Sequence, residues 1–235
     1  MKPVAIFRHA STEGPGYFAT VLERHQVPWR LIKVDAGEAV PADPRAFSGL
    51  AFMGGPMSVN DSLPWIAPTL ALIRDGVEAG VPVLGHCLGG QLMSKALGGV
   101  VSRNAVTEIG WGEVEVQGNA AAQQWFRNYA PSFEAFHWHG ETFTIPPGAE
   151  RVLANPNCGN QAFALGPHLG MQCHIEMTRE MIDLWCAAGA REISRSSSPA
   201  VQTVAAIKSG LEPRLSALRG VADGVYALWI RGLAA

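Results

Sequence analysis

Short apolar runs alternate with amphipathic stretches through the first hundred residues of the chain. Runs of this length are typical of strands that are buried on both faces, and the stretches between them place apolar residues at helical spacing, as at Phe18, Val21 and Leu22. The pattern predicts strands at residues 3–7, 29–34, 50–53 and from residue 81 to Cys87, and helices at residues 17–25, 64–79 and 88–97. We therefore expect an α/β fold with a mostly parallel central sheet flanked by helices.

The second half of the chain changes character. Apolar and polar residues alternate at 111–116, and turn signals separate further short strands expected at residues 134–139, 151–154, 160–164 and 169–175. This pattern predicts an antiparallel extension of the same sheet. A helix is expected at residues 178–188, with Thr178 as its N-cap.

A polar hinge at residues 195–199 precedes amphipathic helical sequence at residues 201–233, with a break expected around Gly220. We expect residues 1–190 to form the α/β domain. Residues 191–235 would form a C-terminal helical extension packed on that same domain.

The segment Gly85-His86-Cys87-Leu88-Gly89 joins a predicted strand to a predicted helix. Gly-x-Cys-x-Gly is the thiol version of the nucleophile elbow, a sharp turn that exposes one side chain beyond the strand end. The helix N-terminus beneath the turn favours a thiolate. A free cysteine is often an inert core residue, but this frame favours a nucleophile at Cys87.

A cysteine nucleophile needs a base and a group that orients the base. His174 and Glu176 stand two residues apart at the end of a predicted strand, where they would share one side. Glu176 can accept the imidazole N–H, and His174 can take the proton of Cys87. We expect His86 to point away from the apex in a structural or pocket-lining role.

His137 and His139 are also two residues apart and suggest a metal pair, but no third and fourth ligand follows at a usual spacing. We therefore expect neither a metal nor a cofactor. An oxyanion hole would come from backbone N–H groups. The residue after the nucleophile, Leu88, would supply one, and the glycine pair Gly54-Gly55 at the neighbouring strand end would supply the second.

Charge, cysteine content and hydropathy limit the partners and the cellular location that we expect. The formal net charge of -2 gives no argument for a nucleic-acid or membrane-surface partner. The four cysteines form no C-x-x-C pair and do not suggest a disulfide framework. The N-terminal apolar run is too short for a signal peptide, and no segment is long and apolar enough to span a bilayer. These features predict a cytoplasmic protein.

Three segments together resemble the class I (triad) glutamine amidotransferases: Gly54-Gly55-Pro56, Gly85-His86-Cys87-Leu88-Gly89-Gly90-Gln91 and His174-Ile175-Glu176. The resemblance covers about residues 3–188 and is closest to stand-alone proteins similar to the glutaminase domain of GMP synthase. It implies a flavodoxin-like fold of the class I glutamine amidotransferase type. It also implies that Cys87 attacks the side-chain amide of glutamine and forms a γ-glutamyl thioester.

The resemblance implies a role for each matched residue. His174 would be the base and Glu176 its orienting partner, and Gly55 and Leu88 would hold the oxyanion. The implied substrate contacts are those of Gly54, Gln91, His139 and Glu141. The chain departs from the family at Trp138, where the synthase-type domains commonly carry serine.

Such domains normally deliver ammonia to a synthase domain, and the sequence after about residue 188 offers only a short helical tail. Either a separate synthase subunit receives the ammonia, or the protein hydrolyses a γ-glutamyl bond for its own sake, as a stand-alone γ-glutamyl peptidase does. A non-catalytic binding or regulatory subunit is a further alternative, and a peptidase or chaperone of the related elbow-cysteine group is a weaker one. A homo-oligomer formed through the tail also stays open.

Overall fold

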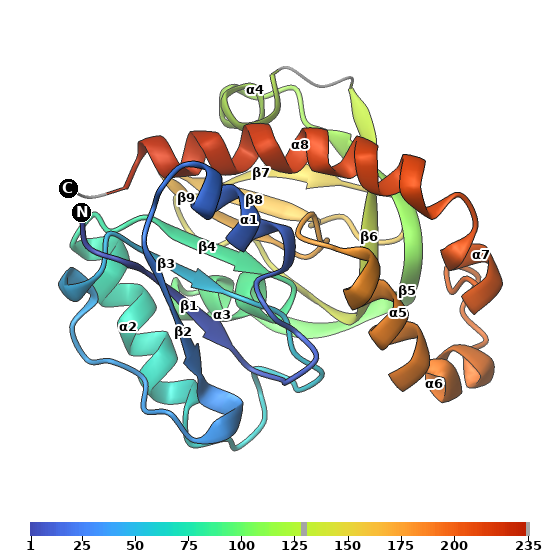
Figure 1. Cartoon of the computed structure of the whole chain (residues 1–235), viewed down its shortest axis with the longest axis horizontal. Helices are drawn as coiled ribbons and strands as arrows, with labels where there is room; N and C mark the ends of the chain where they lie inside the picture. The colour runs from blue at the N-terminus through green and yellow to red at the C-terminus, as the bar shows by residue number, and fades with distance from the viewer. Residues whose placement is uncertain (128–130, 234–235) are drawn as a thin grey trace.

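The computed structural model describes residues 1–127 and 131–233, and in these residues a single mixed sheet runs through the molecule (Figure 1). It has nine strands in the order β2-β1-β3-β4-β9-β8-β7-β5-β6. Five are parallel neighbours: β2 (Trp29–Lys33), β1 (Val4–Arg8), β3 (Gly49–Phe52), β4 (Val83–His86) and β9 (His168–Met171). The antiparallel part comprises β8 (Ala162–Leu165), β7 (Glu150–Ala154), β5 (Val101–Val116) and β6 (Ser132–Phe143). The expected fold class is confirmed.

Helices cover both faces of the parallel strands, which explains their continuous apolar runs. Along β1, Val4 and Ile6 enter one hydrophobic cluster, whereas Ala5 and Phe7 enter the other. The first cluster is covered by α1 (Gly16–Arg24), α5 (Arg179–Ala188) and α8 (Leu211–Arg231), and the second by α2 (Ile66–Glu78) and α3 (Leu88–Ala96). Both faces of the parallel strands are thus shielded from solvent, as is typical of parallel sheets.

The C-terminal sequence folds differently from the expectation in one respect. The predicted break at Gly220 is wrong, because α8 runs unbroken from Leu211 to Arg231 and crosses the sheet in Figure 1. The chain breaks instead at Gly210, whose φ of 61° lies in the left-handed region, between α8 and the short α7 (Val204–Lys208). Residues 234–235 of the predicted extension lie outside the described residues.

Some elements were not expected from the sequence. These are α4 (Ala120–Phe126), α6 (Ala190–Arg195) and the 3₁₀ turns η1 (Val34–Ala36) and η2 (Pro44–Ala46). Strand β5 begins ten residues before the predicted start at residue 111. The N-cap prediction is confirmed: the Thr178 hydroxyl accepts a hydrogen bond of 3.3 Å from the Met181 N–H at the start of α5.

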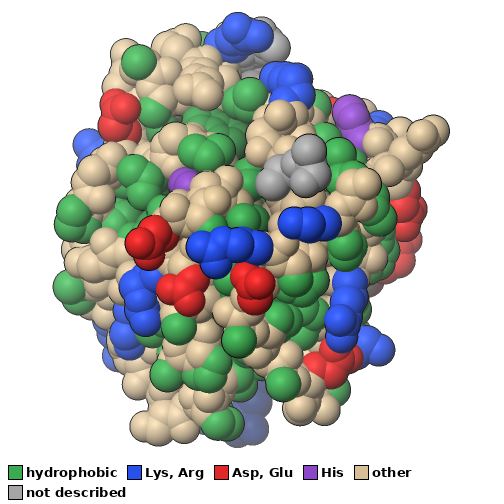
Figure 2. All heavy atoms as spheres, turned by 90° about the vertical axis from the view of Figure 1, so that its left-hand side faces the viewer, with side chains coloured by type: hydrophobic (Ala, Val, Ile, Leu, Met, Phe, Trp, Pro, Cys, Tyr) green, Lys and Arg blue, Asp and Glu red, His purple; other side chains and the backbone are tan. Residues whose placement is uncertain are grey.

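The surface shows no dominant charge on the face drawn in Figure 2. Basic and acidic side chains are interspersed there with apolar ones, in keeping with the net charge of -2. Among residues 1–127 and 131–233, no helix combines the length and the apolar character needed to cross a membrane.

Candidate active site

Cys87 occupies a strained turn between β4 and α3. Its φ of 50° and ψ of -107° place a non-glycine residue in a sparsely populated backbone region, which costs on the order of 1–3 kcal/mol. The turn is fixed by a hydrogen bond of 2.8 Å from the Cys87 N–H to the Met171 carbonyl at the end of β9. Cys87 is 7% exposed and lines a pocket. This geometry is that of a nucleophile elbow.

Glycines after the turn let α3 approach the sheet closely. A Cβ on Gly89 would collide with the Phe52 carbonyl of β3, and one on Gly90 would collide with the Met171 carbonyl of β9. The first turn of α3, with its free N–H groups, is therefore held directly behind Cys87. The local sequence Gly-x-Cys-x-Gly-Gly thus fixes both the bend and the close approach of the helix.

His174 and Glu176 form a buried pair beside the thiol. The imidazole Nδ1 lies 2.6 Å from the Glu176 Oε1, and each side chain is 1% exposed. Burial alone would lower the pKa of His174, but the Glu176 carboxylate and the Cys87 sulfur raise it well above its usual value. Burial opposes ionisation of Glu176, yet the imidazoles of His174 and His86 lower its pKa to about 2.

The predicted strand at residues 169–175 is too long. Strand β9 ends at Met171, and His174 forms an isolated bridge to β6, with its N–H donating to the Phe136 carbonyl at 2.8 Å. The Trp185 ring packs edge-on against the imidazole at 4.9 Å between centroids. The antiparallel extension and α5 therefore position the imidazole.

His86 points away from the pocket, behind the Glu176 carboxylate. Its Nε2 lies 2.9 Å from the Tyr226 hydroxyl on α8 and 3.7 Å from the Glu176 Oε2. Burial lowers the pKa of His86, and the nearby carboxylate opposes this shift. His86 thus supports Glu176 from the core side.

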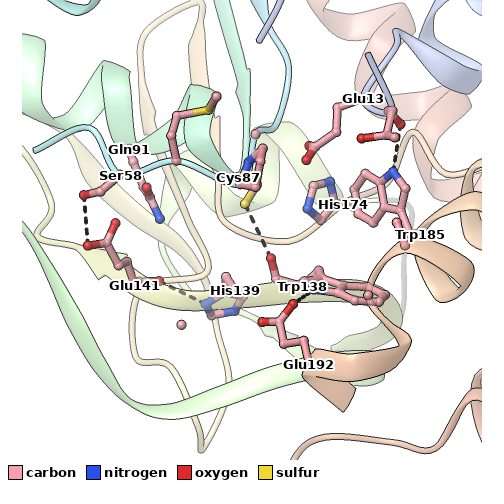
Figure 3. Close-up of a pocket in the computed structure, with 17 residues that line it drawn as sticks. Glu13, Ser58, Cys87, Gln91, Trp138, His139, Glu141, His174, Trp185 and Glu192 are labelled. Carbon is pink, nitrogen blue, oxygen red and sulfur yellow. Dashed lines mark hydrogen bonds between the residues drawn. The ribbon is translucent and has the colours of Figure 1, made fainter. Parts of the chain in front are cut away.

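A pocket of about 440 Å³ opens beside Cys87, a size suited to one small ligand (Figure 3). Six of the residues predicted from sequence line it: Gly55, Cys87, Gln91, His139, Glu141 and His174. Three do not: Gly54, Leu88 and Glu176. Glu176 lies behind His174, and Leu88 is a buried first residue of α3 whose backbone N–H follows the nucleophile.

Hydrogen bonds order the polar wall of the pocket opposite His174. Ser58 donates to the Glu141 Oε1 at 3.0 Å, and the Gln91 side-chain amide donates to the Gln172 Oε1 at 3.1 Å. Gln172 in turn places its amide nitrogen 3.5 Å from the Cys87 sulfur.

Other pocket residues were not identified from the sequence. Glu13, Ser58, Trp185 and Glu192 belong to no motif and come from distant parts of the chain. Glu13, Trp185 and Glu192 come together where α5, α6 and the loop after β1 converge, and the Trp185 Nε1 donates to the Thr12 carbonyl at 2.8 Å. Ser58 comes from the loop after β3.

One buried cluster has donor atoms suited to a metal ion. Within the described chain, ligand atoms of Glu108, His137 and His139 lie within 4.8 Å of one another. A carboxylate with two imidazoles is a common ligand set for zinc. The Glu108 carboxylate already accepts hydrogen bonds from the side-chain amides of Asn155 and Gln161, at 2.7 and 2.8 Å. We assign no metal to it.

The His139 Nε2 lies 3.1 Å from the Glu108 Oε2, and its Nδ1 lies 3.0 Å from the Glu141 carbonyl. Burial opposes ionisation of Glu108, but His139 and His137 lower its pKa to about 2. The cluster thus orients His139, and the sequence spacing missed it because Glu108 lies on β5, opposite His139 across the β5–β6 pairing.

Comparison with known proteins gives consistent matches. The family model described as "Glutamine amidotransferase class-I" matches residues 20–183. The glutamine amidotransferase-like protein YfeJ of Salmonella typhimurium is 28% identical over 181 residues, which are 74% of this chain and 76% of that protein. GMP synthase [glutamine-hydrolyzing] of Aeropyrum pernix is 35% identical over 198 residues, 80% of this chain but 36% of the synthase. The chain thus spans about a third of that synthase.

Solved structures match over nearly the whole chain. A glutamine amidotransferase from Methylobacillus flagellatus superposes with a TM-score of 0.97 and 43% identity, covering 100% of this chain and 96% of that one. A glutamine amidotransferase from Thermotoga maritima gives a TM-score of 0.87 and 25% identity, covering 97% of this chain and 98% of that one.

Proposed function

Since the chain belongs to the class I glutamine amidotransferase family, we propose that it hydrolyses the γ-amide of glutamine or of a γ-glutamyl compound through a γ-glutamyl thioester on Cys87. The observation that carries this proposal is the buried 2.6 Å contact between His174 and Glu176 at the wall of the pocket that Cys87 enters. That contact gives the thiol an oriented base.

In the first half of the reaction, the Cys87 sulfur attacks the γ-carbonyl carbon while His174 holds the thiol proton. Backbone N–H groups of Gly55 and Leu88 stabilise the oxyanion of the tetrahedral intermediate. The C–N bond then breaks as His174 gives its proton to the leaving nitrogen. The products of this half-reaction are a thioester on Cys87 and free ammonia or a free amine.

In the second half, water attacks the thioester with His174 as base. The C–S bond breaks, the thiol regains a proton through His174, and glutamate leaves. Glu176 keeps the imidazole oriented and balances its positive charge in both halves. No step requires an oxidant, a reductant or a cofactor.

The glutamyl end of the substrate is proposed to bind at Gln91, His139 and Glu141, which lie on the side of Cys87 opposite His174 (Figure 3). The role proposed for Gly54 changes. A Cβ at Gly54 would collide with the Glu13 carboxylate, so this glycine makes room for Glu13 and affects the substrate only through it.

The fate of the released nitrogen depends on partners. Among the relatives are GMP synthases described as glutamine-hydrolysing, of which this chain matches about a third. A separate synthase subunit therefore remains one proposed receiver of ammonia. The proposed C-terminal extension, residues 191–235, is proposed to pack on the same domain as residues 1–190. The support for this packing is that Leu215, Val225 and Trp229 of α8 join the same hydrophobic cluster as Phe18 of α1.

The proposal is tested by measuring glutamate release from glutamine and from a neutral γ-glutamyl alkylamide. The purified protein should release glutamate, and Cys87→Ala should reduce release to background. Cys186→Ala is the matched control, because Cys186 is a buried thiol on α5 outside the pocket lining. Wild-type rates in Cys87→Ala would contradict the mechanism. An inert wild-type protein would favour the non-catalytic alternative.

A further inference from the structure

The pocket has two chemically different ends on either side of Cys87 (Figure 3). Ser58, Gln91 and Glu141 lie on one side, and Glu13, His174 and Trp185 lie on the other. In the proposed reaction His174 gives a proton to the departing nitrogen, so the leaving amine must occupy the His174 end. The residues at that end therefore determine which amines fit.

Glu13 places a carboxylate beside the catalytic imidazole. The position that a Cβ on Gly54 would take is occupied by the Glu13 Oε2, and the His174 Cε1 lies 3.2 Å from the same point. Within residues 1–127 and 131–233, the Glu13 side chain has neither a hydrogen-bond donor nor an ion-pair partner. An acidic group without a partner at a ligand pocket is suited to bind a cation supplied by the ligand.

An ionised Glu13 carboxylate is energetically unfavourable at this position unless the ligand supplies such a cation. Burial raises the pKa of Glu13 to about 7; the His174 imidazole opposes this shift, and the Glu176 carboxylate adds to it by a smaller amount. A positively charged ligand group would remove that cost.

Aromatic rings and a second carboxylate complete the same end. The rings of Trp138 and Trp185 meet edge to face at 6.0 Å, and His174 packs against Trp185. The Trp138 Nε1 donates to the Glu192 Oε2 at 3.0 Å, which holds this exposed carboxylate at the pocket rim. Indole faces attract organic cations, and so do carboxylates.

Among the described residues that line the pocket there is neither lysine nor arginine. Two of its three carboxylates, Glu13 and Glu192, belong to the His174 end, and the third, Glu141, lies on the other side of Cys87. We propose, on the basis of the proposed hydrolysis, that the His174 end accepts a leaving amine with a second positive charge. The preferred substrate class is then the γ-glutamyl amides of aliphatic diamines or comparable cationic amines.

The same arrangement disfavours γ-glutamyl peptides. Their leaving amine carries a carboxylate, which would face Glu13 and Glu192 with no lysine or arginine in the described lining to balance it. The inference therefore separates this protein from a γ-glutamyl peptidase, although the chemistry at Cys87 is the same.

Three γ-glutamyl amides of similar length test the inference: the 4-aminobutyl, pentyl and 3-carboxypropyl amides, which carry a cationic, neutral and anionic end. We expect kcat/KM at pH 8 to fall in that order, with the cationic amide favoured over the neutral one by about tenfold. Glu13→Gln should reduce this ratio strongly. Glu192→Gln should reduce it less, because Glu192 is exposed. The exposed Glu38→Gln is the control and should keep the ratio.

The outcomes separate the two proposals. Hydrolysis of all three amides without preference, or faster hydrolysis of the anionic one, would overturn the inference and leave the proposed function standing. A ratio unchanged in both pocket variants would overturn it as well. If no amide and no glutamine is hydrolysed, the proposed function fails. Calorimetric binding of the three amides to Cys87→Ala then decides the inference alone, with the cationic amide expected to bind most tightly.

Discussion

Replacing Glu176 with glutamine removes one charge from the centre of the site and little else. The amide oxygen can still accept from the His174 Nδ1, which lies 2.6 Å from the carboxylate, but it cannot balance an imidazolium. Two unit charges about 4 Å apart interact by roughly 4 kcal/mol at an effective dielectric constant of about 20. Both side chains are 1% exposed, so solvent replaces little of this interaction. We expect Glu176→Gln to lose about 3–4 kcal/mol of transition-state stabilisation, or about 10²–10³-fold in kcat/KM.

The assay is initial glutamate release from glutamine at pH 7.5, with a thermal melt recorded on the same sample. Glu38→Gln makes the same chemical change on the surface and should retain the wild-type rate. A folded Glu176→Gln protein that loses less than about tenfold in kcat/KM would show that His174 does not depend on this carboxylate. It would refute the proposed role of the pair.

Three further predictions concern packing and pH. Gly89→Ala brings a Cβ against the Phe52 carbonyl and should lower the free energy of unfolding by roughly 1–3 kcal/mol in urea titrations. Gly118→Ala is the control, because its Cβ meets nothing within 4 Å and should change the free energy of unfolding little. Equal losses of stability in the two variants would disprove the close approach of α3 to the sheet. Burial lowers the pKa of His168 from 6.5 to about 4, so the unfolded chain binds the proton first and stability falls as pH drops from 6.5 towards 4. His168→Asn keeps an acceptor for the Val83 N–H and should remove about 3 kcal/mol of this acid-induced loss in the free energy of unfolding. If the free energy of unfolding of the variant depends on pH as in the wild type, His168 is not the group responsible. The ratio of kcat/KM for the 4-aminobutyl amide to kcat/KM for the pentyl amide should rise between pH 6 and 8, because Glu13, which faces His174 and Glu176, ionises with a pKa of about 7. If this ratio does not change with pH in the wild type, or still rises in Glu13→Gln, Glu13 is not the group responsible.

Local sequence predicts the parallel half of the fold, the bend at Cys87 and the pairing of His174 with Glu176. Strands such as β1 are apolar on both faces because Val4 and Phe7 enter different hydrophobic clusters, and that pattern is visible along a few residues. The bend at Cys87 and the pairing of His174 with Glu176 depend on neighbours in the chain. Both were therefore accessible to sequence reasoning.

Features that depend on distant contacts were not accessible. His174 lies beyond the end of β9, and its backbone is held by Phe136 of β6, which no local pattern indicates. Gly220 is a helix breaker in isolation, yet α8 packs along the sheet and runs through it without a break. Tertiary packing outweighs a propensity cost of about 1 kcal/mol for one glycine.

Sequence motifs also did not predict the residues that form the pocket wall. Glu13 and Trp185 are far apart in the sequence, and a hydrogen bond from the indole N–H of Trp185 to the Thr12 carbonyl links the two segments. Glu108 likewise reaches His139 only through the pairing of β5 with β6. The proposed catalytic residues are recognisable from local sequence, whereas the features proposed to select the substrate arise from the assembled fold.

The central claim is that Cys87 carries the acyl group, and trapping that group tests it most directly. The wild-type protein is mixed with glutamine or the 4-aminobutyl amide, quenched in acid within the first turnover, digested and analysed by mass spectrometry. We predict a mass increase of one γ-glutamyl group on the peptide that contains Cys87, and on no other cysteine peptide. Turnover with no adduct on this peptide, together with undiminished glutamate release by Cys87→Ala, would contradict the account.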